Sequence, residues 1–432
     1  MQTDNDWEAP HGSGPVHATI RLPGSKSMTN RALVIAALAG GPTTIAGPLL
    51  ARDTELMATA VAALGATVTR DGTGGDGTTW TVTPGWTGEP ASVNVGNAGT
   101  VLRFMPPLAA LAKADVQFHG DARAAQRPVG ELLDGLRQIG VDVDDNGRGA
   151  VPFTIRGRGG VRGGTVTLDA SSSSQLVSGL MLAAPRYDSG LVIRHVGARI
   201  PSAPHIAMTV AMLQAAGAAV TADGSSWQVR PGALSPGTIV VEPDLSNAAP
   251  FLAAALVTGG QVTLPGWPEP SLQAAGPILE VLGEMGASVE LTAAGLRLRG
   301  TGRIRGIRAN LRDVSELTPV LCALAAIADS PSEFTGIAHL RLHESDRLAA
   351  LAAEIGGLGG QVNELPDGLH VQPRPLRPGA EPFDSHDDHR LVMGAAVLAL
   401  AVPGMRVRNA GTVGKTFPDF ASLWRQMLER PS

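Results

Sequence analysis

The sequence predicts an α/β protein of two similar domains, each built from three repeated units. Five times, a helical stretch ends in a small-residue turn and a short Val-bearing strand follows; the turn glycines are Gly65, Gly140, Gly217, Gly286 and Gly359. These glycines recur every 69 to 77 residues, a period that suits a repeated α/β unit and not a solenoid of small repeats. Glycine after a helix supplies the left-handed C-cap, and Val favours the strand that follows. A chain of 432 residues is long enough for two or three domains.

The domain boundaries are predicted from where this repeat is interrupted. A sixth helix is expected at 418–428 with no strand after it, and the N-terminal segment 16–22 (VHATIRL) is the candidate for its missing strand. This closure makes the last domain discontinuous, with chain crossings near Pro23-Gly24 and near Glu242-Pro243. We therefore expect one domain over 24–241, a second over 13–23 plus 242–428, and a flexible N-terminus over 1–12.

Periodicity and turn residues predict the individual elements. The segments 29–39 and 348–358 are each apolar along one side and predict helices, the first of which ends at Gly40-Gly41. The apolar run 319–328 predicts another helix. Hairpins are expected at the turn pairs Asp71-Gly72, Asn146-Gly147, Asp223-Gly224 and Asp367-Gly368.

Composition argues against several classes of function. The net charge of −5 argues against a nucleic-acid surface, which needs an excess of basic residues, so any anion site is local. The acidic segment 1–15 has no apolar region typical of a signal peptide, and the longest apolar runs are too short to span a bilayer. The single cysteine, Cys322, is interpreted as a buried core residue in a reducing compartment. We expect a cytoplasmic protein that binds neither nucleic acid nor membrane.

Six segments share one pattern, a Gly- or Ser-rich polar turn that carries a cation or hydroxyls and leads into an apolar helix. They are 23–31 (PGSKSMTNR), 96–103 (GNAGTVLR), 171–175 (SSSSQ), 342–347 (LHESDR), 387–390 (DDHR) and 414–418 (GKTFP). Helix N-termini carry N–H groups without intrahelical acceptors and a partial positive charge, so they attract anions. Several such turns, most with a Lys or Arg, predict a site for more than one anionic group.

Each segment taken alone has a plainer interpretation. Lys26 could be a solvated surface charge, and the serine run 171–174 could be a flexible loop. The triplet 414–416 (GKT) suggests a phosphate-binding P-loop, but the required glycine five residues earlier is Asn409, so we reject that reading. The segment 386–389 (HDDH) could suggest a metal, but it lacks a helical His pair with a suitable third ligand, so no metal is expected.

Together and in this order, the motifs resemble the 5-enolpyruvylshikimate-3-phosphate synthase (EPSP synthase) family over nearly the whole chain. The matching segments are 23–31, 96–103, Arg127-Pro128, 344–347, 388–390 and 415–418. The resemblance implies two similar domains, each of three βαβαββ repeats in an inside-out α/β barrel. It implies transfer of the enolpyruvyl (1-carboxyvinyl) group of phosphoenolpyruvate to the 5-hydroxyl of shikimate 3-phosphate, with release of phosphate, by a monomer that uses no cofactor.

The resemblance also implies which residues bind each substrate. It assigns phosphoenolpyruvate to Lys26, Gly99, Arg103, Arg127, Gln175, Arg347, Arg390 and Lys415. It assigns shikimate 3-phosphate to Lys26, Ser27, Arg31, Ser173, Ser174, Gln175, Ser202, Glu316, His339 and His343. Glu316 matches the family's proton acceptor, and Glu344 matches a carboxylate proposed as proton donor. Lys26 and His343 complete the catalytic set. The alternative for Glu344 is a purely structural ion pair with Arg347. Because both domains contribute, domain closure is expected to assemble the site.

Four positions depart from the commonest family pattern. His343 stands where many members have Lys, His339 where they have Asn, His205 where they have Tyr, and Phe104 where they have Pro. A His at 343 can still donate to the substrate, but its charge depends on pH near neutrality. Gly99 is present, so we expect inhibition by glyphosate, which occupies the phosphoenolpyruvate site in sensitive members of the family.

Three other interpretations compete with this resemblance. UDP-N-acetylglucosamine 1-carboxyvinyltransferases share the fold and the donor but carry Lys-Asn at the first motif and usually a loop cysteine, whereas this chain has Lys26-Ser27 and only Cys322. An RNA 3′-phosphate cyclase-like protein is disfavoured by the acidic charge and the scarcity of aromatic residues. An inactive anion-binding protein is disfavoured because the cations and carboxylates of the motifs are intact.

Overall fold

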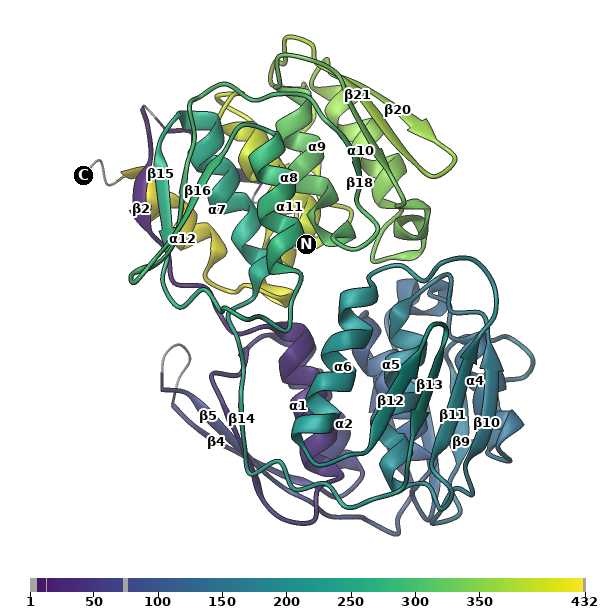
Figure 1. Ribbon diagram of the computed structural model, residues 1–432. Coiled ribbons are helices and arrows are strands. Elements are labelled where there is room, and N and C mark those ends of the chain that lie inside the picture. The colour runs from purple at the N-terminus through teal and green to yellow at the C-terminus, as the bar shows by residue number, and fades with distance from the viewer. Residues whose placement is uncertain (1–5, 13, 73–76, 430–432) are drawn as a thin grey trace. The chain divides into compact units, whose positions relative to one another are not determined.

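The computed structural model describes residues 6–12, 14–72 and 77–429, and the chain forms two compact units. One unit is Pro23–Glu242, and the other joins Met1–Leu22 to Pro243–Ser432 (Figure 1). Both crossings from one unit to the other carry a proline. Each unit contains three copies of a βαβ-based repeat.

The unit of residues 23–242 contains three complete repeats. The first has α1 (Lys26–Ala37), β3 (Thr43–Ala46), α2 (Arg52–Ala63), β4 (Thr67–Asp71), β5 (Thr79–Thr83) and, from the end of the unit, β14 (Thr238–Val240). The second has β6 (Ala91–Asn94), α3 (Gly99–Ala109), β7 (Asp115–His119), α4 (Gly130–Gln138), β8 (Asp142–Asp144) and β9 (Phe153–Arg156). The third has β10 (Gly164–Leu168), α5 (Ser174–Ala183), β11 (Leu191–His195), α6 (Ala203–Ala215), β12 (Val220–Asp223) and β13 (Ser226–Val229).

The other unit repeats this plan. Its first repeat has β2 (His17–Thr19), α7 (Leu245–Thr258), β15 (Gln261–Leu264), α8 (Ala275–Glu284), β16 (Ser288–Thr292) and β17 (Gly295–Arg299). The second has β18 (Arg308–Asn310), α9 (Thr318–Ala326), β19 (Ser332–Thr335), α10 (Arg347–Gly357), β20 (Gln361–Leu365) and β21 (Gly368–Gln372). The third has β22 (Phe383–Asp384), α11 (His389–Ala399), β23 (Arg406–Arg408), α12 (Phe420–Glu429) and, from the N-terminus, β1 (Trp7–Glu8).

Each complete repeat forms its own four-stranded sheet with one strand order. In β6-β7-β9-β8, β6 is parallel to β7, with Ala91 opposite Val116, and β9 is antiparallel to both of its neighbours. The parallel pair needs a long crossover, here the helix α3, whereas the antiparallel strands β8 and β9 follow one another without a helix between them. The sheets share no strand pairing in the ranges that the structure describes, so no closed β-barrel joins them there.

The two chain crossings exchange the first strands of the units. β2 precedes α1 in the sequence but pairs parallel with β15, after α7, whereas β14 precedes α7 but pairs parallel with β3, after α1. The prediction that segment 16–22 completes the last repeat is therefore wrong. Because β14 pairs with β3, the edge beside β15 is open, and β2 occupies it.

The last repeat is completed by β1, which lies within the segment expected to be flexible. Trp7 is opposite Val407 of β23, and its ring lies edge-on to Phe420 of α12, with 6.5 Å between the ring centroids. The expectation of a flexible segment over 1–12 is thus wrong for residues 7–8, because strand pairing and ring packing order them. Residues 1–5 lie outside the described residues.

The centre of each unit is a group of three mutually packed helices that are buried along nearly their whole length. These are α1, α3 and α5 in one unit and α7, α9 and α11 in the other. Their C-terminal halves are almost entirely apolar on all sides, as a fully buried helix requires, and their polar residues lie mostly in the first two turns. The motifs 23–31, 96–103, 171–175 and 387–390 lie at the N-termini of inner helices, whereas 342–347 leads into α10 and 414–418 leads from the end of the 3-10 helix Ala410–Lys415 toward α12.

The repeat glycines end helices as expected. All five follow a helix directly and have φ between 85° and 114°, the left-handed region in which glycine is free of steric cost. No helix among the described residues is long and apolar enough to cross a membrane.

Candidate active site

The predicted site residues are found in both units, mostly near helix N-termini. In the unit of residues 23–242 they are Lys26, Ser27, Arg31, Gly99, Arg103, Arg127, Ser173, Ser174, Gln175 and Ser202. In the other unit they are Glu316, His339, His343, Glu344, Arg347, Arg390 and Lys415.

Lys26 is the first residue of α1. The Ser25 hydroxyl caps this helix by accepting from the N–H of Met28 at 3.4 Å. Lys26 Nζ lies 3.0 Å from Asp53 Oδ2 in α2, and the two side chains are only 18% and 7% exposed. This mostly buried pair holds the ammonium group in place, so Lys26 is not a solvated surface charge.

Arg31 lies one turn further along α1 and is fully buried. Its guanidinium donates to the Thr209 hydroxyl (2.7 Å), the Ser178 hydroxyl (3.3 Å) and the carbonyls of Ser27 (2.9 Å) and His205 (3.0 Å). Burial lowers the pKa of Arg31 to about 9. The contacts with Ser178 in α5 and His205 in α6 bring the starts of these helices to that of α1.

Gly99, the first residue of α3, lies beside two arginines. A Cβ at this position would be 2.5 Å from Arg127 Nη2 and 2.9 Å from Arg103 Nη1. Arg103 donates from Nη1 to Gln175 Oε1 (2.9 Å) and from Nε and Nη2 to the carbonyl of Pro128 (3.1 and 2.9 Å). Burial and the nearby Arg127 charge lower the pKa of Arg103 well below its ordinary value. An anion between these guanidinium groups would relieve their repulsion.

Serine hydroxyls cap α5 and precede α6. Ser173 is the N-cap of α5 and accepts from the N–H of Gln175 at 3.3 Å, and Ser174 is the first residue of the helix. Ser202 stands at the N-cap of α6 with φ of 52°, a conformation uncommon for serine. The run 171–174 therefore forms a turn and a helix start, which suits it to bind an oxyanion.

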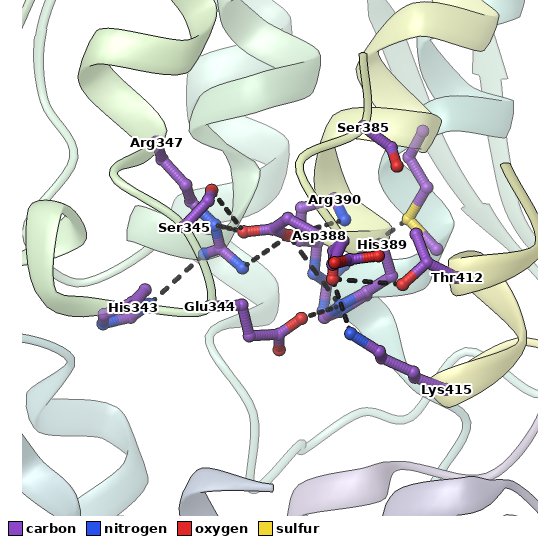
Figure 2. A network of polar contacts seen from close by, with 12 residues as sticks. His343, Glu344, Ser345, Arg347, Ser385, Asp388, His389, Arg390, Thr412 and Lys415 are labelled. Carbon is purple, nitrogen blue, oxygen red and sulfur yellow. Dashed lines mark hydrogen bonds and ion pairs between the residues drawn. The ribbon is translucent and has the colours of Figure 1, made fainter. Parts of the chain in front are cut away.

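In the other unit, Arg347 forms a buried ion pair with Asp388 (Figure 2). Arg347 donates from Nε to Asp388 Oδ2 (2.7 Å) and from Nη2 to Oδ1 (3.1 Å), and the Ser345 hydroxyl donates to Oδ2 (3.1 Å). Asp388 also caps α11 by accepting from the N–H of Arg390. Burial alone would raise the pKa of Asp388, but the Arg347 charge overrides it and the pKa lies below its usual value.

Glu344 lies next to this pair and contacts a buried histidine. Its Oε2 is 2.9 Å from His389 Nδ1, whereas the carboxylate bonded to Arg347 is Asp388. Ligand atoms of Glu344, Asp388 and His389 lie within 4.8 Å of one another, a spacing that could hold a metal ion. Because both oxygens of Asp388 already accept from a guanidinium, this donor set fits a divalent cation poorly.

Arg390 and Lys415 are two further cations of this network (Figure 2). Arg390 donates to the carbonyl (2.9 Å) and the hydroxyl of Ser246, in the first turn of α7. Burial lowers the pKa of Arg390, and the Asp244 charge acts in the opposite direction. Lys415, at the end of the 3-10 helix Ala410–Lys415, donates to the carbonyl of Asp387.

Two of the three histidines at departing positions, His339 and His343, lie together beside the turn that carries Glu316. Glu316 is in the 3-10 turn Ser315–Leu317 just before α9, and His339 Nε2 is 3.0 Å from the Ser315 hydroxyl. The rings of His339 and His343 pack edge to face with centroids 5.4 Å apart, and His343 Nδ1 is 3.3 Å from Arg347 Nη1. Burial lowers the pKa of His339 to about 4, so this imidazole is neutral near pH 7.

Three contacts of the site involve partners that the sequence reasoning did not select. Asp53 pairs with Lys26, Asp388 with Arg347, and His389 contacts Glu344. The position of Asp388 directly before an apolar helix is a recognisable N-cap signal. Asp53 and His389 carry no such signal, because their partners lie in other helices or loops.

Comparison with known proteins gives a consistent result. Residues 10–424 match the EPSP synthase (3-phosphoshikimate 1-carboxyvinyltransferase) family. A 3-phosphoshikimate 1-carboxyvinyltransferase of Mycobacterium ulcerans (strain Agy99) is 49% identical over 442 residues, covering the whole of both chains. An EPSP synthase structure from Acinetobacter baumannii is 26% identical with a TM-score of 0.78, covering 96% of this chain and 97% of that one.

A more distant structure shares the fold. The enolpyruvyl transferase NikO from Streptomyces tendae is 19% identical with a TM-score of 0.75, covering 96% of each chain. The family match spans both units and all six motifs. The chain belongs to the EPSP synthase family.

Proposed function

We propose that this chain transfers the enolpyruvyl group of phosphoenolpyruvate to the 5-hydroxyl of shikimate 3-phosphate and releases phosphate. The observation that carries this proposal is the arrangement at α3, where Gly99 leaves room beside the guanidinium groups of Arg103 and Arg127. A small dianion suits such a position because bidentate guanidinium contacts bind carboxylate and phosphate. The full-length similarity to 3-phosphoshikimate 1-carboxyvinyltransferases supports the choice of substrates.

The proposal gives each substrate its own set of side chains. Phosphoenolpyruvate takes Lys26, Gly99, Arg103, Arg127, Gln175, Arg347, Arg390 and Lys415. Shikimate 3-phosphate takes Lys26, Ser27, Arg31, Ser173, Ser174, Gln175, Ser202, Glu316, His339 and His343. Arg31 binds the shikimate carboxylate, and the hydroxyls at the starts of α5 and α6 bind its phosphate. Fixed cations and N–H dipoles then offset the repulsion between the two anionic substrates.

The reaction is an addition followed by an elimination. Glu316 accepts the proton of the 5-hydroxyl as its oxygen attacks C2 of phosphoenolpyruvate, and Glu344 donates a proton to the methylene carbon. The tetrahedral intermediate then loses a proton from the new methyl group, and the C–O bond to phosphate breaks. His389, 2.9 Å from Glu344, is placed to orient that carboxyl group. Lys26 and His343 complete the proposed catalytic set by stabilising charge that develops at the substrates.

The proposed reaction sets further expectations. The reaction exchanges no electrons with an external carrier, so it needs no redox cofactor. A monomer in the cytoplasm remains the prediction for its assembly and location. Glyphosate is expected to compete with phosphoenolpyruvate, and full activity in saturating glyphosate would contradict this.

The direct test is phosphate release by the purified protein with phosphoenolpyruvate and shikimate 3-phosphate. A parallel assay replaces shikimate 3-phosphate with UDP-N-acetylglucosamine. Release with shikimate 3-phosphate alone supports the proposal. Phosphate release with the sugar nucleotide alone would show that this chain uses the acceptor of UDP-N-acetylglucosamine 1-carboxyvinyltransferases. No release with either acceptor would favour an inactive anion-binding protein.

Two variants then test the residues. Glu316→Gln and Lys26→Met are each expected to lower kcat by about 10²- to 10⁴-fold, because proton transfer and charge stabilisation are lost. Glu290→Gln is the matched control, since Glu290 is exposed on β16 and pairs with Arg297. Equal activity of Glu316→Gln and the control would remove Glu316 from the mechanism.

A further inference from the structure

Arg31 is a buried cation that no acidic group balances in the described part of the chain. The residue is 1% exposed, and the four acceptors of its guanidinium are neutral, namely the hydroxyls of Thr209 and Ser178 and the carbonyls of Ser27 and His205. A guanidinium has five N–H donors. Within the described residues, one donor of Nη1 therefore has no acceptor and is available to an anion.

Phe104 presents an aromatic ring to this cation. Phe104 lies in the second turn of α3 and is fully buried, with its ring centroid 5.1 Å from Arg31 Cζ. The face of an aromatic ring carries a partial negative charge that attracts a cation. Phe104 directly follows Arg103, which is bonded to Gln175 in α5. The start of α3 thus contacts both Gln175 and Arg31.

We propose that Phe104 is a positioning residue for shikimate 3-phosphate, whose ring holds the Arg31 guanidinium in its binding geometry before the substrate carboxylate arrives. This rests on the proposed function, in which Arg31 binds that carboxylate. A desolvated cation without an acidic partner is drawn toward water or other oxygen atoms. If the guanidinium had moved, returning it to the binding geometry would cost free energy and weaken substrate binding. A ring that holds it in that geometry in advance therefore increases affinity. Phe104 acts through Arg31 and does not touch the substrate.

The test replaces Phe104 by phenylalanines with one, two and three ring fluorines. Fluorination nearly preserves the shape of the ring and weakens its negative face stepwise, so loss of packing does not confound the result. The KM for shikimate 3-phosphate is expected to rise at each step, reaching about tenfold, the range of a desolvated cation–π contact. The values of kcat and of the KM for phosphoenolpyruvate are expected to change by less than about twofold.

Phe118 is the matched control for this series. It is buried in β7 of the same unit and stacks on Phe153 with centroids 4.8 Å apart. Fluorination at 118 is expected to leave the KM for shikimate 3-phosphate unchanged. Phe104→Leu, which keeps an apolar side chain but removes the ring, is expected to raise that KM without lowering kcat.

The outcomes separate this inference from the proposed function. Wild-type turnover with a KM that is flat, or falls, across the Phe104 series overturns the inference alone. A rise of equal size in the Phe118 series shows a general packing effect and also overturns it. Absence of wild-type phosphate release with both acceptors overturns the proposed function and the inference with it.

Discussion

Arg31 and Arg103 in one unit and Arg347 in the other are held by different kinds of partner. In the unit of residues 23–242, Arg31 and Arg103 donate to carbonyl, amide and hydroxyl oxygens, and burial lowers both pKa values. In the other unit, Arg347 is bidentate with the buried carboxylate of Asp388. Burial there would lower the pKa of Arg347, but the Asp388 charge outweighs it and the pKa is raised.

This difference indicates that the two kinds of arginine have different roles. A buried cation without an acidic partner is costly in the free protein and is stabilised when an anion binds, so Arg31 and Arg103 suit substrate binding. A buried ion pair is already balanced, and breaking it leaves a single buried charge. The Arg347–Asp388 pair therefore suits a fixed framework beside Glu344 and His389, which holds Arg347 in place for phosphoenolpyruvate.

The largest effect on stability is expected from breaking that framework. Asp388→Asn keeps the shape of the side chain but removes the charge that balances Arg347, and should lower the free energy of unfolding by about 3 to 5 kcal/mol. Urea denaturation measures it. Asp346→Asn is the control, because Asp346 caps α10 by accepting from the N–H of Ala349 but is 40% exposed. Equal losses in both variants would contradict a special role for the pair.

Removing the cation of Arg103, whose acceptors are neutral, should give the opposite result. Arg103→Met is expected to lower kcat/KM for phosphoenolpyruvate about hundredfold, because a charge-assisted contact with the substrate is lost. Its free energy of unfolding should change by less than about 1 kcal/mol, since the lost hydrogen bonds are offset by removal of a buried charge. Phosphate release and urea denaturation give the two values. A loss of stability as large as that of Asp388→Asn would contradict the proposed difference between Arg103 and Arg347.

A smaller effect is expected from filling the space beside the arginines. Gly99→Ala places a Cβ 2.5 Å from Arg127 Nη2 and should raise the KM for phosphoenolpyruvate about tenfold by displacing a guanidinium group. Gly130→Ala is the control, because Gly130 also begins a helix, α4, and its Cβ would meet only Gly149 at 3.5 Å. Equal KM values in both variants would show that the α3 start does not bind this substrate.

The smallest effect is the pH dependence of stability that His339, in the unit of Arg347, is expected to cause. Burial lowers the pKa of His339 to about 4 from 6.5. Between these values the unfolded chain binds a proton that the folded chain does not, so stability falls as the pH drops from about 6.5 toward 4. Between pH 7 and 5, the wild type should lose about 1 to 2 kcal/mol more than His339→Asn. Parallel stability curves for the two proteins would show that His339 is not held neutral.

The sequence predicts the parts of this molecule that depend on local chemistry. Gly65 and its four counterparts end helices with positive φ because that requirement is local. The position of β2 is not predictable in this way, because a strand of three residues does not specify its partner and the choice depends on where β14 pairs. The pairing of Arg347 with Asp388 depends in the same way on the tertiary structure, which brings the start of α10 to the N-cap of α11.

The free energy of unfolding with and without shikimate 3-phosphate tests most directly whether the cations without acidic partners serve the substrate. Wild-type protein should gain about 2.7 kcal/mol at a ligand concentration of 100 Kd. Without ligand, the free energy of unfolding of Arg31→Met should lie within about 1 kcal/mol of the wild-type value. At the same ligand concentration it should rise by almost nothing. A variant that is much less stable without ligand, yet gains as much as wild type when ligand is added, would show that Arg31 supports the fold and not the substrate.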